Sequence, residues 1–174
     1  EVKYMSASLQ YSDYSGVEDF VVPYEILDTC QEKAYLEQSK VAMKNYQKLV
    51  QDSVDHDSAG YCAPQGMRNI LLISATPYQW KHMIHQRVCR RNTAETRYVM
   101  LQIWKELLSQ NVELFSDCGP YCMNGTCEEG AMTCGKSMLP TMTVDDIIRV
   151  DFPKIAGMES FEGKEGEADE DTVD

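Results

Sequence analysis

The chain has 174 residues, of which 43% are hydrophobic and 25% are charged. This composition suits a globular protein with a hydrophobic core and excludes a wholly disordered chain. No run of about 18 consecutive apolar residues occurs, so the sequence predicts no transmembrane helix and no membrane partner. The start of the chain, EVKY, has no apolar signal core, and we therefore expect no secretion signal and a cytoplasmic location.

The net charge of −12 is unevenly spread, because residues 159–174 hold eight acidic residues and one Lys and so carry −7 of it. We interpret this end as a solvated, disordered acidic tail, with an interaction tail as the alternative. Overall acidity argues against non-specific binding to nucleic acid, which needs a basic surface to displace counterions. One local anion site is still compatible with it.

The first half of the chain predicts extended segments, a long helix and a strand. Residues 8–12 and 20–23 look extended and are joined by a turn at Gly16. A long helix is expected from Asp28 or Thr29 to about Val54, because apolar residues recur there at helical spacing. Residues 69–75 (NILLISA) are short, apolar and partly β-branched, which predicts a buried strand.

Three further helices are expected after this strand. Thr76 suits the N-cap and Pro77 the first position of a helix that reaches about Arg87. Asn92 or Thr93 can cap the next helix, which runs to about residue 110. After residue 117 the chain becomes rich in Gly and Cys, and a short helix at 144–150 can then be capped by residue 143.

The most informative window is residues 81–97, which gathers five basic residues and two His in an acidic chain: Lys81, His82, His85, Arg87, Arg90, Arg91 and Arg97. Guanidinium groups beside a helix N-terminus provide planar donors, backbone N–H groups and a favourable dipole for one anion. This predicts a phosphate or carboxylate site, with a solvated basic turn paired to nearby acids as the alternative. The two His, three residues apart, could bind a metal only with a third ligand and are otherwise ordinary polar or core residues.

Several features occur in a fixed order along the chain: Pro64, a strand at 70–74, Arg87, Cys89, Arg91 and a helix start at 94–97. In this order they resemble the flavin-dependent thymidylate synthase family, in which a Leu-Pro break, a buried strand and a helix lead to an Arg and an Ala-Gln-x-Glu-x-Arg helix start. Residues 8–12 resemble the end of the family signature, and residues 118–135 resemble the Cys-rich end of some members. The resemblance covers roughly residues 8–136.

This resemblance implies an α/β (α+β) fold, with a twisted, mainly antiparallel sheet flanked by helices in a single domain that is part of a larger fold. The expected domain covers residues 1–136, followed by a short helix and linker at 137–158 and the acidic tail at 159–174. It implies a methyltransferase that converts dUMP to dTMP with methylenetetrahydrofolate, FAD and NADPH. The expected partners are further copies of the chain in a homotetramer, or a missing N-terminal part.

The resemblance also implies site residues. Ser8 and Arg87 are expected to be catalytic and to bind substrate together with Gln10, while the cofactor-binding residues are Tyr11, Thr76, Tyr78, His82 and Arg91. The family's flavin-binding Arg-His-Arg signature is absent and is expected upstream of residue 1. Gln10 and Gly60 stand where the family commonly has Arg, so a degenerate member that binds nucleotide without turnover is an alternative.

Four cysteines close to one another suggest a metal site. Cys118, Cys122, Cys127 and Cys134 are spaced C-x3-C-x4-C-x6-C among glycines, which is compatible with structural Zn, a metal-free reduced loop, a disulfide or a cluster. Cys89 lies in the basic turn, where a neighbouring Arg could lower its pKa. A non-catalytic interaction module stabilised by Zn is therefore the alternative to the enzyme.

Overall fold

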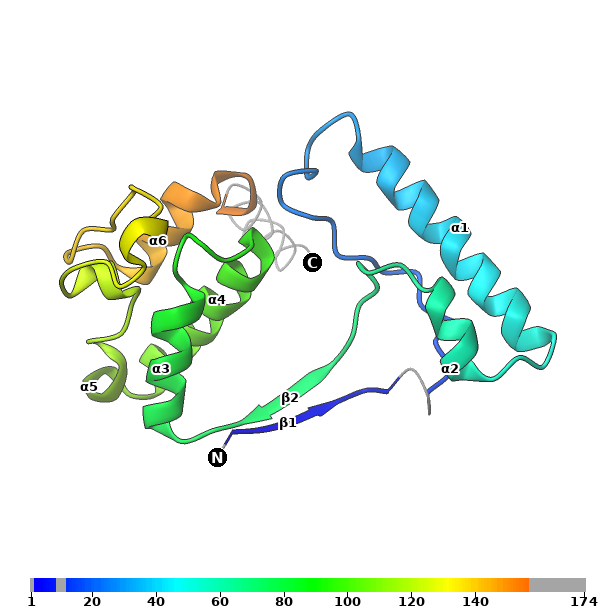
Figure 1. Ribbon diagram of the computed structural model, residues 1–174, viewed down its shortest axis with the longest axis horizontal. Coiled ribbons are helices and arrows are strands. Elements are labelled where there is room, and N and C mark those ends of the chain that lie inside the picture. The colour runs from blue at the N-terminus through cyan, green and yellow to red at the C-terminus, as the bar shows by residue number, and fades with distance from the viewer. Residues whose placement is uncertain (1, 9–11, 157–174) are drawn as a thin grey trace, which may run out of the picture. The chain divides into compact units, whose positions relative to one another are not determined.

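The computed structural model describes residues 2–8 and 12–156. The chain forms two compact units, which divide between Thr76 and Pro77. The first unit contains β1 (Lys3–Ser6), α1 (Glu32–Gln51), α2 (His56–Ala59), η1 (Gly60–Cys62) and β2 (Leu71–Ser74) (Figure 1). The second contains α3 (Pro77–Arg87), α4 (Ala94–Gln110), α5 (Val112–Phe115), η2 (Tyr121–Met123), η3 (Gly130–Met132) and α6 (Val144–Asp151).

The sheet is antiparallel, as expected, but smaller than expected. β1 and β2 pair with Lys3 opposite Ser74, and they are the two strands of the sheet within the described residues. The described chain is therefore mostly helical. The interpretation of residues 69–75 as a buried strand is wrong about burial, because Leu71 and Leu72 of β2 are 53% and 63% exposed. The side chains of a strand are buried only when other elements pack on both faces of its sheet, and a two-stranded sheet offers little surface for such packing.

The long helix of the first unit is confirmed, with shorter limits than the sequence predicts. Asp28 has a φ of +57°, which is incompatible with a helical start, and α1 begins at Glu32. Ser53, with a φ of +65°, follows its end. α1 contributes Met43 and Tyr46 to a core completed by Tyr14 and Ala59.

The helices of the second unit match the predictions most closely, since their start signals are local. α3 begins at Pro77 and ends at Arg87, as predicted. α4 follows Thr93, whose hydroxyl accepts a hydrogen bond from the Thr96 N–H at 3.4 Å. The largest buried side chains of this unit include Ile84, Val88, Leu101, Ile147 and Phe152.

α6 begins with a reciprocal capping box. The Thr143 hydroxyl accepts a hydrogen bond from the Asp146 N–H at 3.1 Å, and the Asp146 carboxylate accepts one from the Thr143 N–H at 3.0 Å. The hydrogen bonds that the Thr143 N–H and hydroxyl donate to this carboxylate hold the pKa of Asp146 below its ordinary value. The predicted cap at residue 143 is therefore confirmed.

Replacing Thr143 with Ala is expected to lower the free energy of unfolding of the protein by about 1 kcal/mol, because the first turn of α6 loses its side-chain acceptor. Urea denaturation followed by circular dichroism measures the change. The matched control is Thr141→Ala, at an exposed residue just outside the helix. Equal losses in the two variants would contradict a role for the cap.

Within residues 2–8 and 12–156, no helix is long and apolar enough to cross a membrane. The expected extended segment at residues 8–12 and the acidic tail at 159–174 fall largely or wholly outside the described residues. The domain limits expected from the sequence stay a prediction.

Candidate functional site

The basic window lies on α3, the turn after it and the start of α4. Three of its five cations are engaged in ion pairs: Lys81 lies 2.8 Å from Asp117, and both Arg90 and Arg97 bind Asp151. The expectation that the guanidinium groups of this window are available to an anion is therefore wrong for Arg90 and Arg97. For these three residues, the alternative of a basic turn paired to nearby acids holds.

Asp151, at the end of α6, is the centre of a buried ionic cluster. Arg90 donates from Nε and Nη2 to its two carboxylate oxygens at 3.0 and 2.7 Å, and Arg97 donates a further hydrogen bond. Arg97 also donates to the Val88 carbonyl at 3.3 Å and lies 5.1 Å from the centre of the Phe152 ring. This cluster joins α6 to the turn between α3 and α4.

Burial and ion pairing have opposite effects on the pKa of Asp151. Burial by itself would raise the pKa of Asp151, but hydrogen bonds and Coulomb attraction from Arg90 and Arg97 outweigh it and hold the pKa below its ordinary value. Asp151 is therefore a carboxylate at neutral pH. The sequence contains no signal for this pairing, since the acid lies 54 and 61 residues from its two partners.

Arg87 and Arg91 are the two cations of the window that stay open. Both are exposed, and neither side chain has a hydrogen bond or ion pair within the part of the chain that the structure describes. Arg87 is the last residue of α3, and Arg91 lies two residues before the Thr93 cap of α4. Two unpaired guanidinium groups near the start of a 17-residue helix are suited to binding an anion.

The remaining predicted site residues are distributed over both units. Tyr78 is 81% exposed near the start of α3, and His82 is exposed one turn later. Ser8, half-buried after β1, and the exposed Thr76 belong to the first unit. The predicted site residues Gln10 and Tyr11 lie outside the described residues, and a site shared by Ser8 and Arg87 stays a prediction.

His85, the second histidine of the window, has a structural role. Its Nδ1 is hydrogen-bonded to the Gly119 carbonyl, and its ring stacks on Tyr121 with the ring centres 5.1 Å apart. These contacts hold the segment that follows α5 against α3. The interpretation of this histidine as an ordinary polar residue fits the structure.

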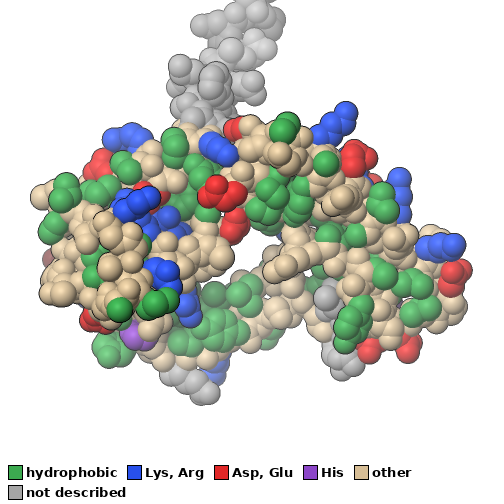
Figure 2. Space-filling model, turned by 45° about the horizontal axis from the view of Figure 1, so that its top comes forward, with side chains coloured by type: hydrophobic (Ala, Val, Ile, Leu, Met, Phe, Trp, Pro, Cys, Tyr) green, Lys and Arg blue, Asp and Glu red, His purple; other side chains and the backbone are tan. Residues whose placement is uncertain are grey.

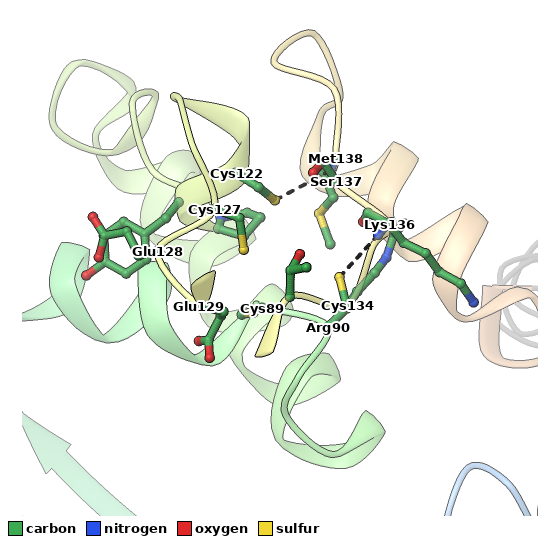
Figure 3. A pocket seen from close by; sticks show the side chains of 13 residues that line it. Cys89, Arg90, Cys122, Cys127, Glu128, Glu129, Cys134, Lys136, Ser137 and Met138 are labelled. Carbon is green, nitrogen blue, oxygen red and sulfur yellow. Dashed lines mark hydrogen bonds between the residues drawn. The ribbon is translucent and has the colours of Figure 1, made fainter. Parts of the chain in front are cut away.

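The structure changes the set of cysteines that lie together. Cys122, Cys127 and Cys134 line one small cavity, and the fourth cysteine of its lining is Cys89 (Figure 3). Cys118, the remaining member of the predicted set, is absent from this lining and is buried elsewhere in the unit, and the predicted metal set stays a prediction. Burial, with a smaller contribution from Asp117, raises the pKa of Cys118 to about 11.

Cys89 differs from its sequence-based expectation as well. Its pKa is raised, first by burial and then by the negative charges of Glu129, Cys134 and Cys122, whereas the Arg91 N–H acts in the opposite direction. The expectation that a neighbouring Arg lowers this pKa is therefore wrong in net effect. A thiol with a raised pKa is a poor nucleophile at neutral pH.

Comparison with known proteins identifies the family. The model of the family described as thymidylate synthase complementing protein (Thy1) matches residues 2–110. The chain belongs to this family. The resemblance to flavin-dependent thymidylate synthases is thereby confirmed.

Individual relatives agree with this assignment. The flavin-dependent thymidylate synthase of Geobacter sulfurreducens is 28% identical over 137 residues, which cover 77% of this chain and 59% of the relative. That of Clostridium tetani is 25% identical over 114 residues, covering 66% of this chain and 43% of the relative. The chain thus spans less than two thirds of the length of these relatives.

Solved structures give the fold. The structure of the flavin-dependent thymidylate synthase ThyX from Helicobacter pylori, complexed with FAD and dUMP, superposes with a TM-score of 0.53 at 16% identity. The match covers 68% of this chain and 62% of that one. At this identity the likeness concerns the fold alone.

Proposed function

We propose that this protein contributes to the reductive methylation of dUMP to dTMP as a flavin-dependent thymidylate synthase, with methylenetetrahydrofolate, FAD and NADPH. The observation that carries the proposal is the match of the family model to residues 2–110, which include Arg87 and the α3–α4 turn. The named relatives are flavin-dependent thymidylate synthases, and the Helicobacter pylori structure contains FAD and dUMP.

Arg87 is the proposed ligand of the dUMP phosphate. A nucleoside monophosphate is a dianion, and a guanidinium group offers it two parallel, charge-assisted hydrogen bonds. Arg90 and Arg97 cannot serve without giving up Asp151, so the open cations of the window are the available ones. Ser8 and Gln10 would complete the substrate site, where a hydrogen-bonding neighbour stabilises negative charge that develops on the uracil oxygens.

The second unit contains some of the side-chain types that binding of FAD requires. Its diphosphate requires cationic donors and its rings require stacking surfaces, and the exposed Arg91 and Tyr78 have these chemistries. When bound, the flavin would supply hydride transfer. Arg91, Tyr78, His82, Thr76 and Tyr11 would bind and orient it.

The proposal includes association of this chain with other polypeptide, either with further copies of itself in a homotetramer or with an N-terminal part that carries the flavin signature. Support comes from the small sheet, where Tyr4, Met5, Leu71 and Leu72 are exposed, as is Ile70 just before β2. Hydrophobic side chains also lie open on the surface in the space-filling view (Figure 2). Exposed apolar side chains gathered on one element are typical of protein–protein contacts.

The test is dUMP binding by the full chain, measured by calorimetry. Arg87→Gln is expected to weaken binding by roughly 10- to 150-fold, since a hydrogen bond to a charged group contributes about 1.5–3 kcal/mol. The matched control is Arg68→Gln, because Arg68 is also exposed but pairs with Asp19 in the first unit. Equal affinities for the two variants, or no dUMP binding by the unaltered chain, would contradict the proposed site.

Two alternatives make different predictions. A degenerate member, suggested by Gln10 and Gly60, would bind dUMP but release no tritium from dUMP labelled at the methylated carbon when FAD, NADPH and methylenetetrahydrofolate are supplied. A non-catalytic interaction module would show neither binding nor release. Tritium release above background supports the enzyme and excludes both alternatives.

A further inference from the structure

Residues 124–137 form a largely irregular segment, interrupted by the single turn η3. Every residue of the segment is exposed except Cys127 and Cys134. A surface segment of this length is normally anchored by apolar side chains that reach the core, and here the two inward-facing side chains are thiols. This pattern suggests that the thiols bind something that holds the segment in place.

Both thiols face the same small cavity as two others. Cys89, just after α3, and Cys122, in η2, complete its lining, and Figure 3 shows the labelled cysteines around one space. The cavity encloses about 20 Å³. This volume is enough for about one water molecule, and therefore for a single ion, but not for an organic ligand.

Backbone N–H groups point at three of these sulfur atoms. The Lys136 N–H donates to Cys134 Sγ at 3.4 Å, and the Met138 N–H donates to Cys122 Sγ at 3.5 Å. The Arg91 N–H donates to the Cys89 thiol. Hydrogen bonds donated to a sulfur atom fix its orientation, as the outer partners of a metal ligand do.

We propose that Cys89, Cys122, Cys127 and Cys134 bind one thiophilic divalent cation, with zinc the best match, and that this ion fixes segment 124–137 to the end of α3. Four thiolates provide the tetrahedral sulfur set of structural zinc sites. Arg90 and Lys136 also line the cavity, as do Glu128 and Glu129, so these four side chains together add no net formal charge to it. Each thiol releases its proton to solvent as its sulfur–metal bond forms.

Binding requires the four sulfur atoms to move closer together. Within the described residues, no three His, Cys, Asp or Glu side chains are already grouped closely enough to hold a metal ion. Gly130 and Gly135, with φ of +53° and +67°, are backbone positions in the segment at which the missing side chain leaves a wide range of dihedral angles open. No other group lies within 4 Å of the Cβ position at either glycine, so both glycines stand in open space.

The test is a cobalt(II) titration of the full chain, reduced and freed of metal, followed by sulfur-to-cobalt charge-transfer absorption. We expect saturation at one ion per chain and displacement by zinc. Cys89→Ser is expected to lose the four-sulfur spectrum, whereas Cys118→Ala is expected to keep it, because Cys118 does not line the cavity. Loss in Cys118→Ala with retention in Cys89→Ser would overturn the proposed ligand set.

A second measurement uses the unaltered chain and so does not depend on how the variants fold. All seven cysteines are free in the structure, and we expect zinc to protect four of them from a thiol reagent until a chelator is added. No protection by zinc would overturn the proposal, and so would a disulfide between cavity cysteines found by mass spectrometry in freshly isolated protein. Neither readout involves dUMP, so this proposal and the proposed function can fail separately.

Discussion

Replacing Asp151 with Ala is expected to lower the free energy of unfolding of the second unit by about 3–5 kcal/mol. The Asp151 and Arg97 side chains are only 8% and 9% exposed, so the change leaves a buried guanidinium group without its counter-ion. Arg90 loses both of its hydrogen bonds to the carboxylate at the same time. The loss arises from uncompensated charge, and it exceeds the net contribution of an intact pair.

The measurement is urea denaturation of the full chain at neutral pH, with hydrogen exchange assigning the change to the second unit. The matched control is Asp145→Ala, which removes another α6 carboxylate whose pair with Lys105 is more than half exposed on both sides. Exposed pairs contribute about 0–1 kcal/mol. If both variants lose the same stability, the cluster around Asp151 is not buried as described.

The same cluster predicts a direction of pH dependence. Because the pKa of Asp151 is lower in the folded state, its contribution is complete above about pH 4, the unfolded carboxyl value, and is lost as the pH falls through the folded pKa. Asp151→Asn should therefore show a shallower loss of stability than the unaltered chain over this acidic range. Parallel curves for the two proteins would contradict this.

Replacing Tyr46 with Ala is expected to cost about 3–5 kcal/mol in the first unit, because a fully buried aromatic ring leaves a cavity. Tyr46→Phe keeps the ring and removes only the hydroxyl, so it measures the contribution of the hydroxyl alone. The Tyr46 hydroxyl accepts a hydrogen bond from the buried Tyr14 N–H at 3.2 Å and lies 3.2 Å from His56 Nδ1. Its removal leaves that N–H unsatisfied, at a cost of about 1–3 kcal/mol.

Thermal and urea unfolding of the full chain, with hydrogen exchange in α1, measure both changes. Tyr61→Ala is the control within the same unit, since Tyr61 is 94% exposed and its loss should change stability by less than about 0.5 kcal/mol. We expect the largest loss of stability in Tyr46→Ala, a smaller loss in Tyr46→Phe and the smallest in Tyr61→Ala. Any other order would contradict the core assigned to this unit.

Some parts of the fold were predictable because their signals are local. Pro77 fixes a start for α3, and Thr93 and Thr143 accept hydrogen bonds from N–H groups three residues later. Such signals act within one helical turn, so a single sequence contains them in full. The start of α1 was misplaced because the left-handed conformation of Asp28 leaves no comparable mark.

The features of the candidate site also divide into those that the sequence contains and those that depend on tertiary contacts. The sequence by itself determined that cations gather at 81–97 and that the chain resembles one enzyme family, because composition and motif order are properties of the chain. Only the tertiary structure decided that Arg90 and Arg97 pair with Asp151 and that Arg87 and Arg91 stay exposed. It also decided that Cys89, and not Cys118, lines the same cavity as Cys122, Cys127 and Cys134. Each of those outcomes depends on which distant side chain provides the better charge or packing partner once the helices have come together, and such competition leaves no pattern in residue spacing.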